Sequence, residues 1–269
     1  MNWLGSAAAR LLPRIRRRRA PLLNIAVDFG EGPVVVLIHG IASSGATFVR
    51  VIPMLSDRYR CIAIDLLGFG GSPAPEGAEY TVEEHVAALH ATIRSLRLTA
   101  PFVLVGHSLG SLLSARLAAV HPGQISRVIL ASPPVYLTPA EISDPRVRSQ
   151  VGAYLRVYQF MRANKNFTIA SAARIASIFQ LGDVLELSER NWRAFMLSLQ
   201  NCIESQTTVS DIAAVRVPID VVYGAQDEFI AAGTMRIIGQ MRHVTMHRVE
   251  VSDHLLRTRL SKALAAIIG

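Results

Sequence analysis

Residues 102–110 have the sequence FVLVGHSLG, an apolar run that ends in a turn with two glycines. The apolar part predicts a buried strand, and the periodicity of residues 109–121 predicts a helix. Between them lies the pattern Gly-x-Ser-x-Gly, which places a serine on a sharp strand-to-helix turn. Gly106 and Gly110 leave room for neighbouring backbone in such a turn. The segment therefore predicts that the hydroxyl of Ser108 stands at a helix N-terminus, where developing negative charge is favoured.

Strands and helices alternate on both sides of this turn. The predicted strands are short and rich in β-branched or aliphatic residues, as in VVVLI at 34–38, and they lie at 24–29, 34–38, 60–64, 102–105, 128–131, 219–223 and 245–251. The predicted helices lie at 47–56, 81–96, 109–121, 233–240 and from 255 onward. Alternation of this kind predicts an α/β fold with a mainly parallel central sheet and helices on both faces.

The alternation is interrupted by a block with no convincing strand. Residues 134–210 contain only helical patterns, near 144–163, 166–180 and 188–205. We therefore expect an α/β core domain formed by residues 21–133 and 206–269, with a helical cap inserted as residues 134–205. Residues 1–20 are expected to be a basic N-terminal extension.

A nucleophilic serine needs a general base and a carboxylate that orients the base. His254 is the best-placed histidine, because it lies in a loop between the last predicted strand and the terminal helix. Asp227 directly follows a predicted strand, at the end of the strand where functional residues collect in such sheets. Asp220, inside that strand, and Asp253, beside the histidine, are less well placed. The candidate catalytic residues are therefore Ser108, Asp227 and His254, in that chain order.

Four landmarks occur in order along the chain. They are His39-Gly40, the run DLLGFGGS at 65–72, the serine motif GHSLG at 106–110 and the segment GAQD at 224–227. With these landmarks the sequence resembles the α/β-hydrolase superfamily over residues 30–260. The similarity is strongest to its serine esterase and lipase-like, haloperoxidase-like and carbon–carbon-bond hydrolase branches.

The resemblance implies how the site works. The backbone N–H groups of Ile41, after the motif glycine Gly40, and of Leu109 would form an oxyanion hole. Some members carry the acid after an earlier strand, but that position here is ASPP at 131–134 and offers no carboxylate. The run at 65–72 is expected to be a structural loop near the site. The first strand of the usual eight is expected to be missing or to be formed by residues 20–29.

The implied reaction is cleavage of a carboxylic ester through an acyl-enzyme on Ser108, with no metal or organic cofactor. A perhydrolase or a carbon–carbon-bond hydrolase would use the same triad, and a ligand-binding module could keep the fold without turnover. A serine at position 108 argues against haloalkane dehalogenases and epoxide hydrolases, whose relatives have an aspartate there.

The predicted cap contains apolar residues that either line an acyl pocket or pack the cap onto the sheet. They are Tyr154, Val157, Tyr158, Phe160, Met161, Ile169, Ile175, Ile178 and Phe179. An apolar or acyl-chain ester is therefore the expected small-molecule substrate.

The net charge of +8 comes mostly from the N-terminal extension. Residues 1–20 contain six arginines and no acid, which leaves 8 − 6 = +2 for the rest of the chain. A basic stripe for nucleic acid is therefore not expected on the folded domain. The extension is either solvated or in peripheral contact with an anionic membrane. Cys61 and Cys202 show no ligand or disulfide spacing, which favours a cytoplasmic location, with membrane association through the extension as an addition.

Overall fold

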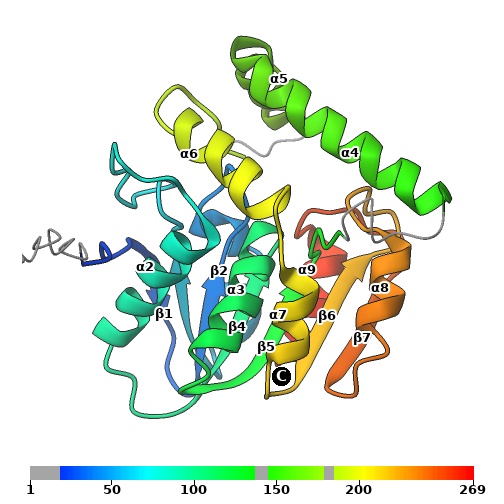
Figure 1. Cartoon of the computed structure of the whole chain (residues 1–269). Helices are drawn as coiled ribbons and strands as arrows, with labels where there is room; N and C mark the ends of the chain where they lie inside the picture. The colour runs from blue at the N-terminus through cyan, green and yellow to red at the C-terminus, as the bar shows by residue number, and fades with distance from the viewer. Residues whose placement is uncertain (1–18, 137–144, 179–184) are drawn as a thin grey trace, which may run out of the picture.

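The computed structural model describes residues 19–136, 145–178 and 185–269, and their strands form one seven-stranded sheet in the order β1-β3-β2-β4-β5-β6-β7 (Figure 1). The strands are β1 (Ile25–Phe29), β2 (Val34–Ile38), β3 (Arg60–Ile64), β4 (Phe102–His107), β5 (Ile125–Ala131), β6 (Ile219–Gly224) and β7 (Val244–Val249). All neighbouring strands are parallel except β1 and β3, which are antiparallel. The predicted mainly parallel α/β sheet is confirmed. Residues 25–29 supply the first strand, at an edge of the sheet.

Side chains of the central strands alternate between two apolar cores. In β2, Val36 and Ile38 belong to one core while Val35 and Leu37 belong to the other, as the two-residue period of a strand requires. Both cores are apolar, so β2 needs apolar residues at every position, and VVVLI supplies them.

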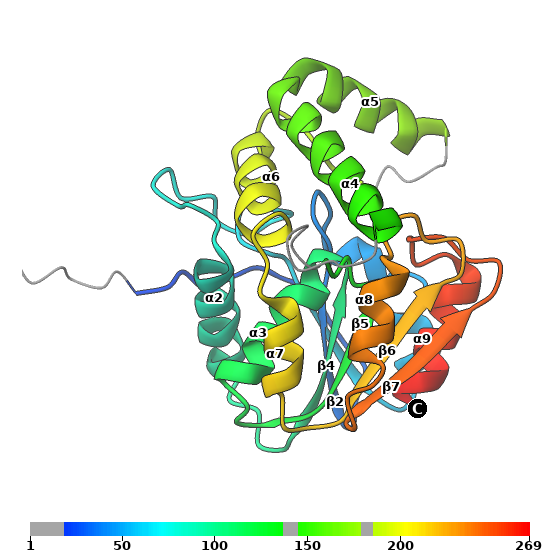
Figure 2. The same cartoon turned by 45° about the vertical axis from the view of Figure 1, so that its right-hand side comes forward.

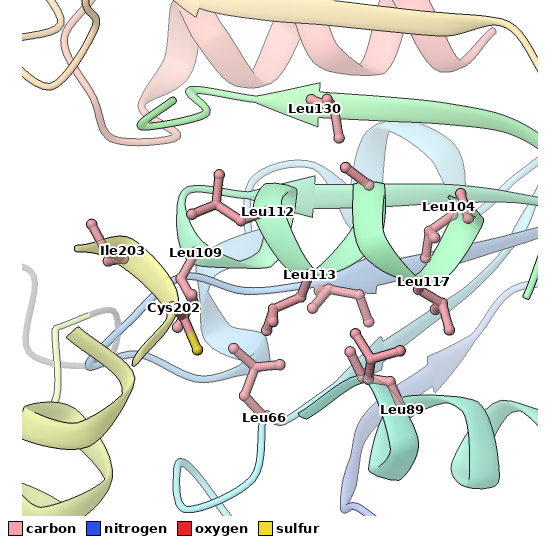
Figure 3. Close-up of a cluster of buried hydrophobic side chains, with 14 of the residues drawn as sticks. Leu66, Leu89, Leu104, Leu109, Leu112, Leu113, Leu117, Leu130, Cys202 and Ile203 are labelled. Atoms are coloured by element: carbon pink, nitrogen blue, oxygen red, sulfur yellow. The ribbon is translucent and has the colours of Figure 1, made fainter. Parts of the chain in front are cut away.

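Helices cover both faces of the sheet (Figures 1 and 2). The larger core lies beneath α2 (Val82–Ser95), α3 (Leu109–Val120), α7 (Thr208–Ala214) and α8 (Ala232–Ile238). The smaller core lies beneath η1 (Gly45–Phe48), α1 (Ile52–Leu55) and α9 (Thr258–Ile268). Figure 3 shows Leu113 and Leu117 of α3 packed between Leu104 of β4 and Leu89 of α2. The helix that follows Ser108 is thereby fixed to the centre of the sheet.

The remaining helices lie above the carboxyl ends of the strands, and we call them the cap helices (Figures 1 and 2). They are α4 (Pro145–Ala163), α5 (Lys165–Ile178), α6 (Trp192–Ser198) and η2 (Leu199–Ile203), a π-helical turn that continues α6. In the chain they come between β5 and β6, within the block where helices were predicted. The limits of a cap domain at 134 and 205 stay a prediction.

Some predictions fall on residues without a described position. Residues 1–18, which hold nearly all of the basic extension, and Phe179 lie outside the described residues, as do the side chains of Ile175 and Ile178. Within the described ranges, no helix is long and apolar enough to cross a membrane.

Candidate active site

Ser108 lies in the turn between β4 and α3 with a φ of 53°, a value that is unfavourable for a residue with a side chain. The turn is possible because the neighbouring backbones almost touch its glycines. A Cβ on Gly106 would lie 2.2 Å from the carbonyl oxygen of Gly110, and one on Gly110 would lie 2.2 Å from that of Ile38. The turn places Ser108 beyond the carboxyl end of β4, directly before the first residue of α3.

His254 bridges Ser108 and Asp227. Its Nε2 atom is 2.9 Å from the Oγ of Ser108, and its Nδ1 atom is 3.0 Å from both carboxylate oxygens of Asp227. The Asp227 carboxylate also accepts the N–H of Phe229 at 3.0 Å. A carboxylate only accepts hydrogen bonds, so Nδ1–H donates to it and the lone pair of Nε2 faces the serine hydroxyl. This is the arrangement in which a histidine can take the serine proton.

Parallel strands bring the three residues together from distant parts of the chain. β6 and β7 pair in register up to Gly224 and Val249, so the loops that follow them emerge side by side with Asp227 and His254. The other two carboxylates considered point elsewhere. Asp220 pairs with Arg127 and His247 at 2.7 Å, and Asp253 pairs with Arg257 at 2.9 Å.

The backbone around Ser108 offers N–H groups for a negatively charged oxygen. Leu109 is the first residue of α3, so its N–H has no acceptor within the helix. The N–H of Ser108 itself is occupied, since it donates to the carbonyl oxygen of Ala131 at 2.9 Å. A Cβ on Gly40 would lie 2.9 Å from the Cβ of Ser108, so the loop that carries Ile41 lies against the serine. The role of Ile41 and Leu109 as an oxyanion hole stays a prediction.

Two buried histidines support the loops of the site. Burial lowers the pKa of His39 to about 4, and burial together with the nearby His254 lowers the pKa of His107 to about 3, so both are neutral. The Nδ1–H of His39 donates to Gly40 at 2.7 Å, while its Nε2 accepts the N–H of Leu66 at 2.8 Å. The ring of His107 donates from Nε2 to the carbonyl oxygen of His254 at 2.9 Å. These contacts give both histidines a structural role in the loops around the site.

The loop at 65–72 is organised around one buried carboxylate, that of Asp65. Its Oδ1 accepts the N–H of Gly45, and its Oδ2 accepts the N–H of Gly71 and the side-chain amide of Asn24, each at 2.8 Å. The hydroxyl of Ser72 donates to the backbone carbonyl of Asp65 at 2.7 Å. The predicted structural role of this loop is confirmed.

A cavity of about 640 Å³ opens in front of Ser108 and His254. Its walls come from the core loops and from the cap helices, and its apolar lining includes Ile41, Ala42, Pro134, Val157, Tyr158, Met161, Phe167, Ala172, Leu185, Leu187, Phe195, Leu199, Ile203, Phe229 and Leu255. Of the cap residues singled out in the sequence, Val157, Tyr158 and Met161 line it. Phe160 is half exposed and is not among the lining residues, and Ile169 packs against the larger core.

The cap helix α4 is tied to the loop that carries Asp227, a feature that the sequence did not reveal. The hydroxyl of Tyr158 lies 3.1 Å from that of Tyr136, which donates to the carbonyl oxygen of Phe229 at 3.0 Å. Tyr154 of the same helix donates to the carbonyl oxygen of Glu228. The ring of Phe229 meets the imidazole of His254 edge-on, with ring centroids 4.8 Å apart. The position of α4 therefore helps to fix the positions of His254 and Asp227.

Known proteins resemble this chain in part of its sequence and in its fold. The chain is 41% identical over 143 residues to "Probable lysophospholipase BODYGUARD 1" of Arabidopsis thaliana, a match that covers 51% of this chain and 29% of that protein. It is 37% identical over 120 residues to the pimeloyl-[acyl-carrier protein] methyl ester esterase of Aeromonas hydrophila, covering 43% of this chain and 44% of that protein. The chain thus matches less than half of the length of either relative.

Among solved structures, an esterase from Exiguobacterium antarcticum superimposes with a TM-score of 0.74 at 17% identity, over 93% of this chain and 99% of that one. At this identity the likeness shows the fold alone. The model of the alpha/beta hydrolase fold family matches residues 33–256. That range begins just before β2 and ends after His254, so it includes the Ser108 turn and both loops that carry its partners. With the sheet, the turn and this match in agreement, the chain belongs to the alpha/beta hydrolase fold family.

Proposed function

We propose that the protein is a serine hydrolase that cleaves carboxylic esters with an apolar acyl chain. The observation that supports this most is the unbroken hydrogen-bonded series from Ser108 through His254 to Asp227, at the floor of a mostly apolar cavity. Each of the three side chains has the neighbour that its part in ester cleavage requires.

In the first half of the reaction the Oγ of Ser108 attacks the ester carbonyl carbon while its proton passes to Nε2 of His254. Asp227 stabilises the imidazolium that forms and keeps the ring in position. The carbonyl oxygen becomes an oxyanion next to the N–H groups of Ile41 and Leu109. Loss of one such donor typically raises the barrier by about 3 kcal/mol.

In the second half the bond to the leaving alcohol breaks and His254 gives its proton to that alcohol, which leaves an acyl ester on Ser108. A water molecule then gives a proton to His254 and attacks the acyl carbon. Collapse of this second oxyanion returns the proton to Ser108 and releases the carboxylic acid.

The cavity supports this substrate class. Its volume of about 640 Å³ lies in the usual range for small-molecule sites, and apolar side chains dominate its walls. The relatives named above include one whose name states a lysophospholipase and one whose name states a methyl ester esterase, both of which fit an acyl-chain ester.

The test is a series of water-soluble 4-nitrophenyl esters with acyl chains of increasing length. Each added methylene that is buried in the cavity should raise kcat/KM by up to about fourfold until the cavity is full. The Ser108→Ala variant should show no turnover above background. Turnover that is absent for every ester, or unchanged by Ser108→Ala, would contradict the proposal. Cleavage of a carbon–carbon bond or formation of a peracid without ester turnover would favour the other reactions of the same triad.

A further inference from the structure

The α4–α5 hairpin contains no acidic residue. Its basic residues are Arg146, Arg148, Arg156, Arg162, Lys165 and Arg174. Arg162 pairs with Glu204 and Lys165 pairs with Glu189. Arg156 and Arg174 are exposed and have no ion-pair partner among the residues that the structure describes. The hairpin therefore presents net positive charge to solvent.

Large apolar side chains are exposed on the same hairpin. Val157 is 53% exposed, Phe160 51% and Phe167 61%, and the two phenylalanine rings meet edge-to-face with centroids 5.6 Å apart. Scattered exposed apolar residues are ordinary, but a cluster of this kind marks an interaction surface. We call Arg156, Val157, Phe160, Phe167 and Arg174 the hairpin face.

Helix geometry brings the charges and the apolar groups together. Arg156 and Phe160 are four residues apart on α4, and Phe167 and Arg174 are seven apart on α5, so each pair lies on one side of its helix. Figures 1 and 2 place α5 on the far side of α4 from the sheet, at the outer end of the molecule. Exposed apolar residues flanked by arginines fit the boundary between the headgroups and acyl chains of an anionic bilayer.

The hairpin face is also continuous with the cavity. Val157 and Phe167 are more than half exposed, yet both line the cavity that reaches Ser108. An acyl chain that leaves a bilayer at this face can therefore enter the cavity along apolar surface.

We propose that the hairpin face binds the surface of an anionic lipid bilayer and admits lipid esters to the cavity. The second part rests on the proposed function, because it takes the cavity to be the ester site. The first part does not depend on catalysis and is tested separately.

Binding is measured by flotation of the full chain, carrying Ser108→Ala, with vesicles of phosphatidylcholine alone and with vesicles that also contain phosphatidylglycerol. The protein should float with the anionic vesicles, less so as salt is raised. The double variant Arg156→Gln and Arg174→Gln should lower the partition coefficient about 25-fold, because each charge near the surface contributes about fivefold. Phe160→Ser should weaken it at least fivefold, because its apolar ring no longer enters the interface.

Matched controls lie at the other end of the sheet, where the parallel strands begin, away from the cap helices. Phe29, at the end of β1, is 61% exposed, as Phe167 is, and Arg94 and Arg97 are exposed near the end of α2. Phe29→Ser and the pair Arg94→Gln and Arg97→Gln should leave the partition coefficient within twofold. A third variant, with the arginines of residues 14–19 changed to glutamine, measures how much the N-terminal extension contributes to vesicle binding.

The inference is overturned if the full chain does not bind anionic vesicles. It is overturned too if binding is lost only with the extension variant, or if the hairpin variants bind as well as the controls.

Failure of the proposed function gives a different result. With Ser108 present, the arginine pair and Phe160→Ser should hydrolyse a short soluble ester within threefold of wild type while losing at least fivefold in hydrolysis of lysophospholipid in anionic vesicles. Vesicle binding without any ester hydrolysis would remove the proposed function and leave the surface in place.

Discussion

At the scale of the residue, the candidate triad consists of three side chains with different surroundings. Ser108 is held in an unfavourable backbone conformation at the start of a helix. The side chain of His254 is 17% exposed and faces the cavity, whereas the side chain of Asp227 is fully buried. A buried carboxylate with two donors in place can hold the imidazole in one orientation, while the partly exposed imidazole can reach a leaving group.

Replacing Asp227 should therefore reduce the rate of ester hydrolysis far more than replacing Asp253, the acid next to His254. The side-chain amide of Asp227→Asn can donate to Nδ1 of His254, which favours the tautomer with the proton on Nε2. In that tautomer Nε2 cannot accept the proton of Ser108. We expect kcat to fall by about a thousandfold or more. Asp253→Asn, the matched change next to His254, should keep at least about a tenth of the activity. Initial rates on a soluble ester decide between the two acids, and equal losses in both variants would contradict the assignment of Asp227.

At the scale of the element, the site depends on how closely α3 approaches the strands. Gly110 in the first turn of α3 lies against the end of β2, since an added Cβ would lie 2.2 Å and 2.5 Å from the carbonyl oxygens of Ile38 and His39. These are backbone atoms, so they cannot rotate away. The glycine is needed because a helix and a strand cross at this point.

Gly110→Ala should accordingly lower the free energy of unfolding by about 3 kcal/mol or more, because backbone must move to admit the methyl group. Gly77→Ala is the control, since nothing lies within 4 Å of a Cβ at that position. It should change stability by less than about 0.5 kcal/mol. Urea unfolding of the two variants measures the difference. A stability of Gly110→Ala close to that of the control would show that α3 and the end of β2 are not closely packed at this point.

At the scale of the whole molecule, three buried neutral histidines make stability depend on pH. Burial lowers the pKa of His39 to about 4 and is the main cause that lowers those of His85 and His107 to about 3. In the unfolded chain each has a pKa near 6.5. Below pH 6.5 the unfolded state binds more protons than the folded state, so this contribution to stability is complete above pH 6.5 and declines as the pH falls toward 4.

The free energy of unfolding should therefore decrease between pH 6.5 and 5, by up to about 1.4 kcal/mol per pH unit for each histidine. His85→Gln removes one of the three and should make the slope shallower by up to about that amount. Urea unfolding at several pH values measures both slopes. Equal slopes for wild type and His85→Gln would contradict this origin of the acid sensitivity.

The sheet and the residues near Ser108 could be predicted from sequence because their signals are local. VVVLI at 34–38 can be satisfied only by a strand buried on both faces, and the glycines of GHSLG fit a tight turn. The range predicted for β2 is the one observed, and β4 and β5 are longer than predicted by a few residues. Asp227 was favoured by its place after a strand, which is also a local signal.

The contacts of the cap helices could not be predicted because they depend on how distant segments pack. Phe160 and Met161 are adjacent in sequence, but one is half exposed and the other lines the cavity. The link from Tyr158 through Tyr136 to the backbone of Phe229 joins three separate segments. The short helix α7 was also missed, because its seven residues show too little periodicity to stand out.

The central claim is that Ser108 is a nucleophile activated by His254, and covalent labelling with a fluorophosphonate tests it most directly. Wild type, Ser108→Ala and His254→Ala are treated at equal concentration, and the adducts are located by mass spectrometry, with circular dichroism to show that each is folded. We predict one adduct on Ser108 in wild type and no adduct in either variant. A folded wild type that stays unlabelled, or an adduct that persists in Ser108→Ala, would contradict the claim.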